Sequence, residues 1–171
     1  MMGLRDWFRG FFVKKQPPPR FHAEAHGDLR KHSEEFREEV IKVTEGVYVA
    51  VGFGLANSIM LVGEGGVVIV DTLGNVDTAT RVHAAFRKIT DLPVKAIIYT
   101  HNHTDHIFGA GVFAGDDNPD VYAHETTSAY IDKIVSLIRP IIMRRSMRQF
   151  GAFLQEGDLI NAGIGPFLET K

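Results

Sequence analysis

The chain has 171 residues, of which 44% are hydrophobic and 23% are charged, and this is the composition of an ordinary single globular domain. A formal net charge of −2 argues against a general nucleic-acid-binding protein, and the lack of cysteine excludes disulfide bonds and thiolate metal sites. No apolar run is long enough to span a bilayer and the N-terminus has no signal-peptide pattern, so we expect a cytoplasmic protein by default.

The N-terminal region, residues 1–20, is predicted to be an amphipathic segment followed by a proline-rich linker. Between Leu4 and Val13, apolar residues recur with helical spacing and basic residues lie beside them, a pattern typical of a helix that contacts a membrane surface. A helix docked on the protein's own core, or a disordered tail, is the favoured alternative, because Gly10 weakens so short a helix. Peripheral membrane contact through this segment is therefore kept as a hypothesis.

The next region, residues 21–45, is polar and charged. We predict a helical lead-in that Asp28 caps and that continues through Val40. From residue 46 to residue 171 the pattern becomes that of an α/β domain. Residues 47–51 are expected to begin the sheet, and residues 57–62 and 67–70 indicate a hairpin joined by a glycine-rich turn.

A helix and a further strand are predicted after the hairpin. An apolar stripe of Val82, Ala85, Phe86 and Ile89 predicts a helix over residues 77–89. Residues 93–99 are apolar and β-branched near their end, which predicts a buried strand. Strands that alternate with a helix favour an α/β layered fold, and such sheets place their sites at the carboxyl ends of their strands.

Four residues with metal-binding side chains follow this strand directly: His101, His103, Asp105 and His106. Neutral imidazoles and carboxylates are ligands that zinc prefers. His101 and His103 are two apart, so on an extended segment they point the same way and can bind one ion, whereas Asp105 and His106 follow a bend and can face a second. Two ions would hold a bridging hydroxide, which is a nucleophile at neutral pH. A loop that is rich in histidine by chance is the weaker explanation.

Basic residues follow a helix that is predicted over about residues 125–138. Arg144 and Arg145 are close enough in sequence to share a helical surface. Guanidinium groups bind sulfate by paired hydrogen bonds, so an anion site is one explanation. A solvated basic helix face explains the two arginines equally well.

The motif His101-x-His103-x-Asp105-His106 resembles the metal signature of the metallo-β-lactamase-fold hydrolases, and the surrounding sequence is most similar to their alkyl sulfatase branch. Residues 66–72, 98–101 and 161–166 carry the resemblance to this branch. The resemblance implies an α/β fold, namely the N-terminal half of an αββα sandwich with helices packed on a mixed sheet. It also implies that Asp71 lies near the metals and orients the ligands, although a cap on the following turn would also explain this aspartate.

The resemblance further implies a metal-dependent hydrolase of sulfate esters that uses a hydroxide bridged by two zinc ions. Asp105 and His106 would be catalytic as well as metal-binding, and Arg144 or Arg145 would receive the sulfate. Thioesters, lactones and β-lactams are alternative substrates within the fold. Because the remaining ligands of the family come from downstream strands, we expect the chain to be a fragment, and a truncated non-catalytic metal-binding half-domain is the other alternative. The expected partner is a small-molecule ester and not a nucleic acid, and a homodimer is also considered.

Overall fold

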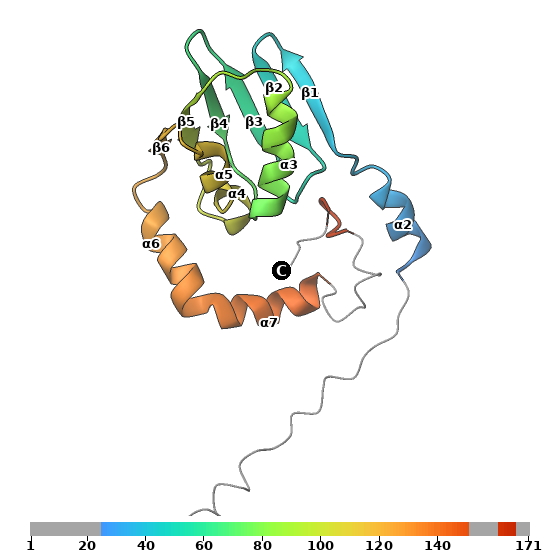
Figure 1. Ribbon diagram of the computed structural model, residues 1–171. Helices are drawn as coiled ribbons and strands as arrows, with labels where there is room; N and C mark the ends of the chain where they lie inside the picture. The colour runs from blue at the N-terminus through green and yellow to red at the C-terminus, as the bar shows by residue number, and fades with distance from the viewer. Residues whose placement is uncertain (1–24, 151–160, 167–171) are drawn as a thin grey trace, which may run out of the picture.

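A six-stranded mixed sheet forms the centre of the protein, whose computed structural model describes residues 25–150 and 161–166. The strands lie side by side in sequence order (Figure 1). The first four strands are antiparallel neighbours, whereas the last three run parallel to one another. This arrangement confirms the expected α/β class with a mixed sheet. The strands are β1 (Glu39–Thr44), β2 (Val47–Val51), β3 (Ser58–Val62), β4 (Val67–Val70), β5 (Val94–Ile98) and β6 (Asp120–Tyr122).

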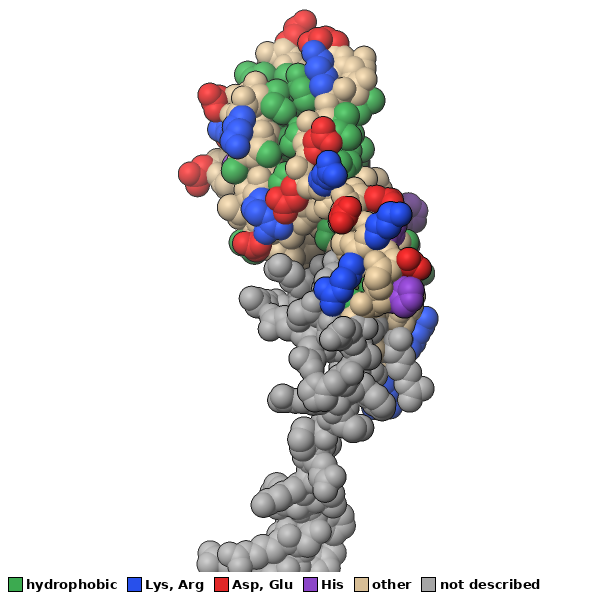
Figure 2. Space-filling model, turned by 90° about the vertical axis from the view of Figure 1, so that its right-hand side faces the viewer, with side chains coloured by type: hydrophobic (Ala, Val, Ile, Leu, Met, Phe, Trp, Pro, Cys, Tyr) green, Lys and Arg blue, Asp and Glu red, His purple; other side chains and the backbone are tan. Residues whose placement is uncertain are grey.

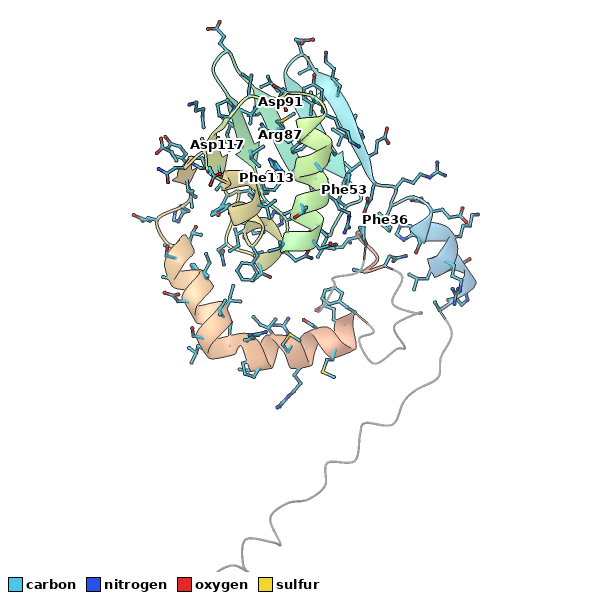
Figure 3. The ribbon with its side chains drawn as sticks, in the orientation of Figure 1. Phe36, Phe53, Arg87, Asp91, Phe113 and Asp117 are labelled. Atoms are coloured by element: carbon cyan, nitrogen blue, oxygen red, sulfur yellow. The ribbon has the colours of Figure 1, made fainter. Side chains whose placement is uncertain are left out.

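Three helices pack on one face of the sheet: α3 (Val76–Arg87), α4 (Thr104–Ile107) and α5 (Ala110–Ala114) (Figure 1). The core lies between them and the strands, and Phe86 of α3 and Phe113 of α5 are both almost fully buried there. The centroids of these two rings are 6.4 Å apart, and Figure 3 shows Phe113 on α5 beside α3. Burial of this apolar surface is the main force that fixes the helices on the sheet.

Helix α3 forms largely as the sequence predicts. Asn75 is its N-cap, and the Asn75 side-chain oxygen accepts a hydrogen bond from the backbone N–H of Thr78 at 2.8 Å. Val82 and Phe86 of the predicted stripe are buried in the core, whereas Ile89 lies beyond the end of the helix and is exposed. The hairpin of β3 and β4 and the strand before the histidine motif are confirmed in the same way.

The lead-in to the sheet differs from the prediction. The helix expected from Asp28 through Val40 is wrong in both its cap and its length, because α2 (Gly27–Ser33) has His26 as its N-cap and ends before the sheet begins. Residues 39–44 form β1 instead, and Val40 pairs with Ala50 of β2. The sheet therefore begins one strand earlier than predicted, because pairing with β2 outweighs the weak helical pattern of this polar segment.

The sheet face opposite the three helices carries an apolar row, and β1 brings part of it to the surface. Ile41, Val49, Ile59, Val70 and Ile98 are successive cross-strand partners from β1 to β5. Ile41 is 42% exposed. Figure 2, seen from the side where β1 lies, shows hydrophobic side chains at the surface of the sheet.

The chain after β6 forms a helical arm, defined here as residues 127–149. It consists of α6 (Thr127–Asp132), a π-helical turn (Lys133–Ile138) and α7 (Arg139–Gln149), so the helix predicted over about residues 125–138 is present and continues further. Within the described ranges, no helix is long and apolar enough to cross a membrane. The segment between Leu4 and Val13 and the linker after it lie outside the described residues, so their predictions stay predictions.

Candidate functional site

The histidine motif lies at one edge of the sheet, where two parallel strands end together. Val70, the last residue of β4, pairs with Ile98, the last residue of β5. Asp71 therefore leaves β4 beside the segment that begins with Thr100 and leads into the motif. Parallel neighbouring strands bring their carboxyl ends to the same edge, so residues 71 and 100–106 converge although they are far apart in sequence.

The backbone at Asp71 has an uncommon conformation. The φ angle of Asp71 is +58°, in the left-handed region that non-glycine residues seldom adopt. Three hydrogen bonds hold it: the Asp71 N–H donates to the carbonyl of Ile98 at 2.9 Å, the Ser58 hydroxyl donates to the Asp71 carbonyl at 2.7 Å, and the next N–H, of Thr72, donates to the carbonyl of His106 at 2.7 Å. Such strain persists only where surrounding contacts fix it, and it is frequent at functional sites.

The Asp71 carboxylate connects the two segments. One of its oxygens, Oδ1, accepts a hydrogen bond from the backbone N–H of Thr100 at 2.8 Å. The other, Oδ2, lies 2.7 Å from the Thr100 hydroxyl and 2.7 Å from Nδ1 of His106. With only 6% of its surface exposed, Asp71 is a buried polar residue whose oxygens are satisfied by these contacts.

These contacts determine which ring nitrogen of two histidines carries the proton. A carboxylate only accepts hydrogen bonds, so Nδ1 of His106 is the protonated nitrogen that donates to Asp71. The Thr100 hydroxyl uses its one hydrogen toward Asp71, so at 3.0 Å it accepts a hydrogen bond from Nδ1 of His101. In the neutral form of either ring the lone pair is then on Nε2, which is the form that binds a metal ion.

The four predicted ligands lie in one cluster. The ring centroid of His101 is 4.0 Å from that of His106 and 4.6 Å from that of His103, and Nε2 of His106 is 3.4 Å from an oxygen of Asp105. Desolvation on burial lowers the pKa of His101 below its ordinary value, and His106 and His103 lower it further, while Asp71 and Asp105 oppose this effect. The environment of His101 therefore favours the neutral ring.

The donor atoms are close together, yet they do not form a finished metal cage. Among the described residues, no group of three or more histidine, cysteine, aspartate or glutamate side chains is arranged to hold a metal ion. The rings of His101, His103 and His106 contact one another instead. The donor set itself has the chemistry that zinc prefers, so the residues present fit a metal ion by their chemical type.

A close approach of two backbones supports the cluster. A Cβ added to Gly109 would lie 1.9 Å from the carbonyl oxygen of Thr72, so the segment after α4 passes the end of β4 at a distance that only glycine allows. Thr100 is a contact of the site that was not among the residues predicted from the sequence. A polar residue directly after a buried strand, as Thr100 is, was the available signal.

The predicted sulfate-binding arginines are not part of this cluster. Arg144 and Arg145 are exposed on α7, and no hydrogen bond or ion pair within the described ranges joins them to the motif. Figure 1 shows α7 well away from α4. Asp71, in contrast, contacts His106 and Thr100, and the cap of the helix that follows it is Asn75.

Comparisons with known proteins point to one protein superfamily. A family model described as "Metallo-beta-lactamase superfamily" matches residues 51–141, which is more than half of the chain. A linear primary-alkylsulfatase of Pseudomonas sp. (strain ATCC 19151) is 43% identical over 111 residues, which are 59% of this chain and 20% of that protein. The alkyl/aryl-sulfatase BDS1 of Saccharomyces cerevisiae is 29% identical over 136 residues, which are 74% of this chain and 21% of that protein. The chain thus spans about a fifth of the length of these curated relatives.

A solved structure is similar in fold. The stereoselective inverting sec-alkylsulfatase of Pseudomonas sp. matches with a TM-score of 0.68 and 22% identity over 85% of this chain and 25% of that protein. This likeness concerns the fold alone, and it confirms the arrangement of a mixed sheet with helices packed on it that the motif resemblance implied.

Proposed function

This chain belongs to the metallo-beta-lactamase superfamily, and we propose that it acts as a metal-dependent hydrolase of alkyl sulfate esters. The observation that carries the proposal is the hydrogen-bonded frame around Asp71, in which Nδ1 of both His101 and His106 is engaged and Nε2 of His106 lies 3.4 Å from an oxygen of Asp105. The alkylsulfatase names of the relatives support the choice of substrate class. The reaction consumes one water and yields an alcohol and hydrogen sulfate.

The residues of the cluster have distinct roles in this proposal. His101, His103, Asp105 and His106 would hold zinc, with two ions in the complete site. Bound zinc would supply Lewis acidity, which lowers the pKa of a water molecule to about 7 and so provides a nucleophile at neutral pH. Asp71 keeps the proton of His106 on Nδ1 and holds its ring in place, since metal-binding histidines depend on such an outer partner.

Substrate recognition in this proposal uses guanidinium groups. Arg144 or Arg145 would bind the sulfate group through paired hydrogen bonds, because a planar guanidinium matches two sulfate oxygens, and this role requires α7 to lie nearer the motif in the substrate complex than it does here. Their positions on an exposed helix make them accessible to a charged ligand. Asp105 and His106 are the motif residues that act on the reacting groups.

The test uses two histidines that are both exposed but differ in location. His103 has no side-chain hydrogen bond at the start of α4, and His124 bonds only to Thr126 among the residues described. The full chain is loaded with zinc and sulfate release is measured with hexyl sulfate, a thioester, a lactone and a β-lactam. We expect release from hexyl sulfate alone, a drop of at least about a hundredfold in His103→Ala, and no change in His124→Ala.

The outcomes separate the proposal from its rivals. Turnover of the thioester, lactone or β-lactam without sulfate release would support a metal-dependent hydrolase of this fold. It would overturn the proposal that the substrate is a sulfate ester. Activity retained in His103→Ala, with equal zinc content, would overturn the assignment of the motif.

A non-catalytic metal-binding domain is the second candidate, and the observation that favours it is the unfinished donor arrangement of the described side chains. Calorimetric titration with zinc distinguishes the two. Two tightly bound ions per chain support the hydrolase, whereas one weakly bound ion supports the binding domain. Membrane contact through residues 4–13 and homodimer formation stay proposals as well, and liposome flotation and sedimentation of the full chain test them.

A further inference from the structure

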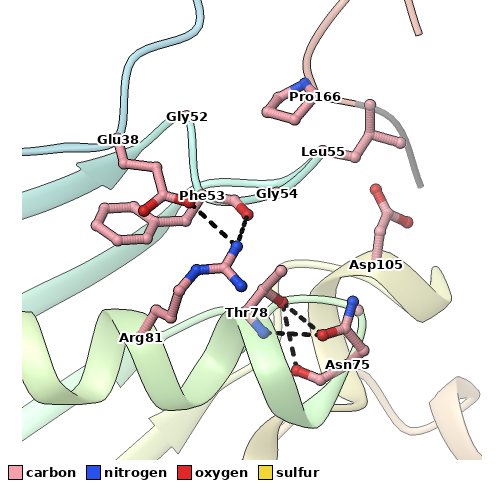
Figure 4. A pocket seen from close by; sticks show the side chains of 11 residues that line it. Glu38, Gly52, Phe53, Gly54, Leu55, Asn75, Thr78, Arg81, Asp105 and Pro166 are labelled. Carbon is pink, nitrogen blue, oxygen red and sulfur yellow. Dashed lines mark hydrogen bonds and ion pairs between the residues drawn. The ribbon is translucent and has the colours of Figure 1, made fainter. Parts of the chain in front are cut away.

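A pocket opens beside Asp105 and is formed by segments that are distant in sequence (Figure 4). Its walls include the loop of residues 52–55 between β2 and β3, the first turns of α3, and Pro166. Because Asp105 belongs to the histidine cluster, whatever enters this pocket lies next to the proposed reaction centre.

The loop of residues 52–55 is pressed against its neighbours on two sides. Gly52 has a φ of +79°, and a Cβ added there would lie 2.2 Å from the carbonyl oxygen of Arg37. On the other side, a Cβ added to Gly165 would lie 3.3 Å from Cα of Leu55. Phe53 is 9% exposed and anchors the loop in the core. The wall of the pocket is therefore a glycine-rich segment whose position depends on close backbone contacts.

Arg81 of α3 joins this loop to two other segments. Its Nη2 donates to the carbonyl oxygen of Phe53 at 3.3 Å and lies 3.1 Å from Oε1 of Glu38, just before β1. Its Nη1 bonds to Asp77 one turn earlier on the same helix. Figure 4 shows the guanidinium between Glu38 and the loop, on the wall of the pocket.

The contacts of Arg81 are poorly explained by stability alone. Arg81 and Glu38 have side chains that are 38% and 45% exposed, and ion pairs this exposed contribute little. The Nε of Arg81 is also buried without a hydrogen-bond partner among the described residues, which costs free energy. The arrangement instead fixes relative positions, since one rigid planar guanidinium joins α3, the loop of residues 52–55 and the segment just before β1.

The charge around Arg81 also limits what the pocket can bind. Two carboxylates, those of Glu38 and Asp77, neutralise its one guanidinium, so it offers no spare positive charge to a sulfate. The lining of the pocket is mixed, with Phe53, Leu55 and Pro166 as its apolar part and polar side chains that include Asn75, Thr78 and Asp105. An uncharged organic group suits this lining better than an anion does.

We propose that Arg81 is a positioning residue that holds the loop of residues 52–55 as the wall of a pocket for the uncharged organic part of the substrate ester. This inference rests on the proposed function only in so far as it calls the ligand a substrate. The pocket and its wall can be tested without metal or turnover. The probe is 1-hexanol, the alcohol that hydrolysis of hexyl sulfate would release.

The experiment follows amide signals of the full chain by NMR, with and without 1-hexanol, and measures hydrogen exchange in the same samples. The variants are Arg81→Met, Arg81→Lys and Glu38→Ala. The matched control is Arg87→Met, because Arg87 lies on the same helix, is exposed, and bonds to the carbonyl of Leu92 on the other side of the fold. Glu38→Ala removes an exposed partner of Arg81 and leaves the core untouched, so it remains informative if Arg81→Met fails to fold.

We expect 1-hexanol to shift the amides of residues 52–55 and 74–75 in the wild type. Arg81→Met should raise the Kd for 1-hexanol about fivefold and accelerate exchange in the loop, a change equivalent to losing one modest contact. Glu38→Ala should raise the Kd and accelerate loop exchange by smaller factors. Arg81→Lys should bind 1-hexanol more tightly than Arg81→Met does, and Arg87→Met should change neither the Kd nor the exchange rate. Zinc affinity should be the same in all variants, which a general loosening of the structure would not allow.

The inference is overturned if 1-hexanol shifts amides elsewhere, if Arg81→Met leaves Kd or loop exchange unchanged, or if the two values change independently. Failure of the hydrolase proposal would appear separately, as absent sulfate release with normal 1-hexanol binding.

Discussion

The edge of the sheet around Asp71 and the helical arm of residues 127–149 differ in how their side chains are held. At the sheet edge, Asp71, Thr100 and His106 are joined by short hydrogen bonds, and Asp71 is buried while His106 is partly buried. In the arm, Leu137 is 71% exposed and Ile141 is 62% exposed, and no side-chain hydrogen bond is seen from residues 133–149 where side chains are described. The sheet edge is therefore held by side-chain hydrogen bonds, whereas residues 133–149 are held, among the described contacts, mainly by the helical backbone.

The largest contrast with the arm should appear when one apolar side chain is removed from the packed core and one from the arm. Phe113 is 1% exposed and packs on Phe86 and His83, so Phe113→Ala should lower the free energy of unfolding by about 3–5 kcal/mol. Leu137→Ala should change it by less than about 0.5 kcal/mol, because that side chain is already in water. Urea unfolding of both variants measures the difference, and similar losses would mean that the arm is packed in solution.

The second prediction concerns the hydrogen bonds of the sheet edge. Asp71→Ala leaves the Thr100 N–H and Nδ1 of His106 without their acceptor, and should destabilise the fold by about 3 kcal/mol. The control Asp116→Ala, at an exposed turn, should cost less than about 0.5 kcal/mol.

Asp71→Asn sharpens this test. Asparagine tolerates the left-handed backbone of residue 71 and still accepts from Thr100, so the fold should be largely kept. The His106 ring should then lose its fixed proton position, which 15N chemical shifts of the imidazole report. An unchanged Nδ1–H signal would contradict the role of Asp71.

The third prediction uses two neighbouring glycines. Gly109→Ala should destabilise the fold by about 1–3 kcal/mol, because the new methyl group would overlap the Thr72 carbonyl. Gly111→Ala should be neutral or stabilise by up to about 1 kcal/mol, since nothing lies within 4 Å and alanine favours the helix. Thermal unfolding of the metal-free chain distinguishes them, and equal effects would contradict the close approach at residue 109.

The smallest expected effect is a dependence on pH. Burial, with His106 and His103 nearby, lowers the pKa of His101 below its ordinary 6.5, so the unfolded chain takes up a proton before the folded one does. Stability from this source is complete above about pH 6.5 and is lost as the pH falls through the folded-state pKa. In the metal-free chain, His101→Gln should therefore lose less stability than the wild type between pH 7 and pH 5. Some loss should persist, because burial also lowers the pKa of His83, with Arg87 adding to the effect. A steeper loss in the variant would contradict this sign.

Much of the architecture could be predicted because its signals are local. The apolar spacing of Val82 and Phe86, the glycine-rich turn of the β3–β4 hairpin and the strand before His101 each lie within a short window of sequence. The segment of residues 39–44 escaped prediction, because its strand form depends on pairing with β2 and not on its own polar sequence.

By itself, the sequence determined that imidazole and carboxylate groups follow a buried strand within six residues, and hence which chemistry this chain can support. Only the tertiary structure decided how these groups are held. The bond between Asp71 and His106 spans 35 residues, and the wall of the pocket is held by Arg81 across 28 residues. Such contacts exist only once the strands have paired and the helices have packed, because burial and backbone register, and not local spacing, bring the partner atoms within hydrogen-bonding distance.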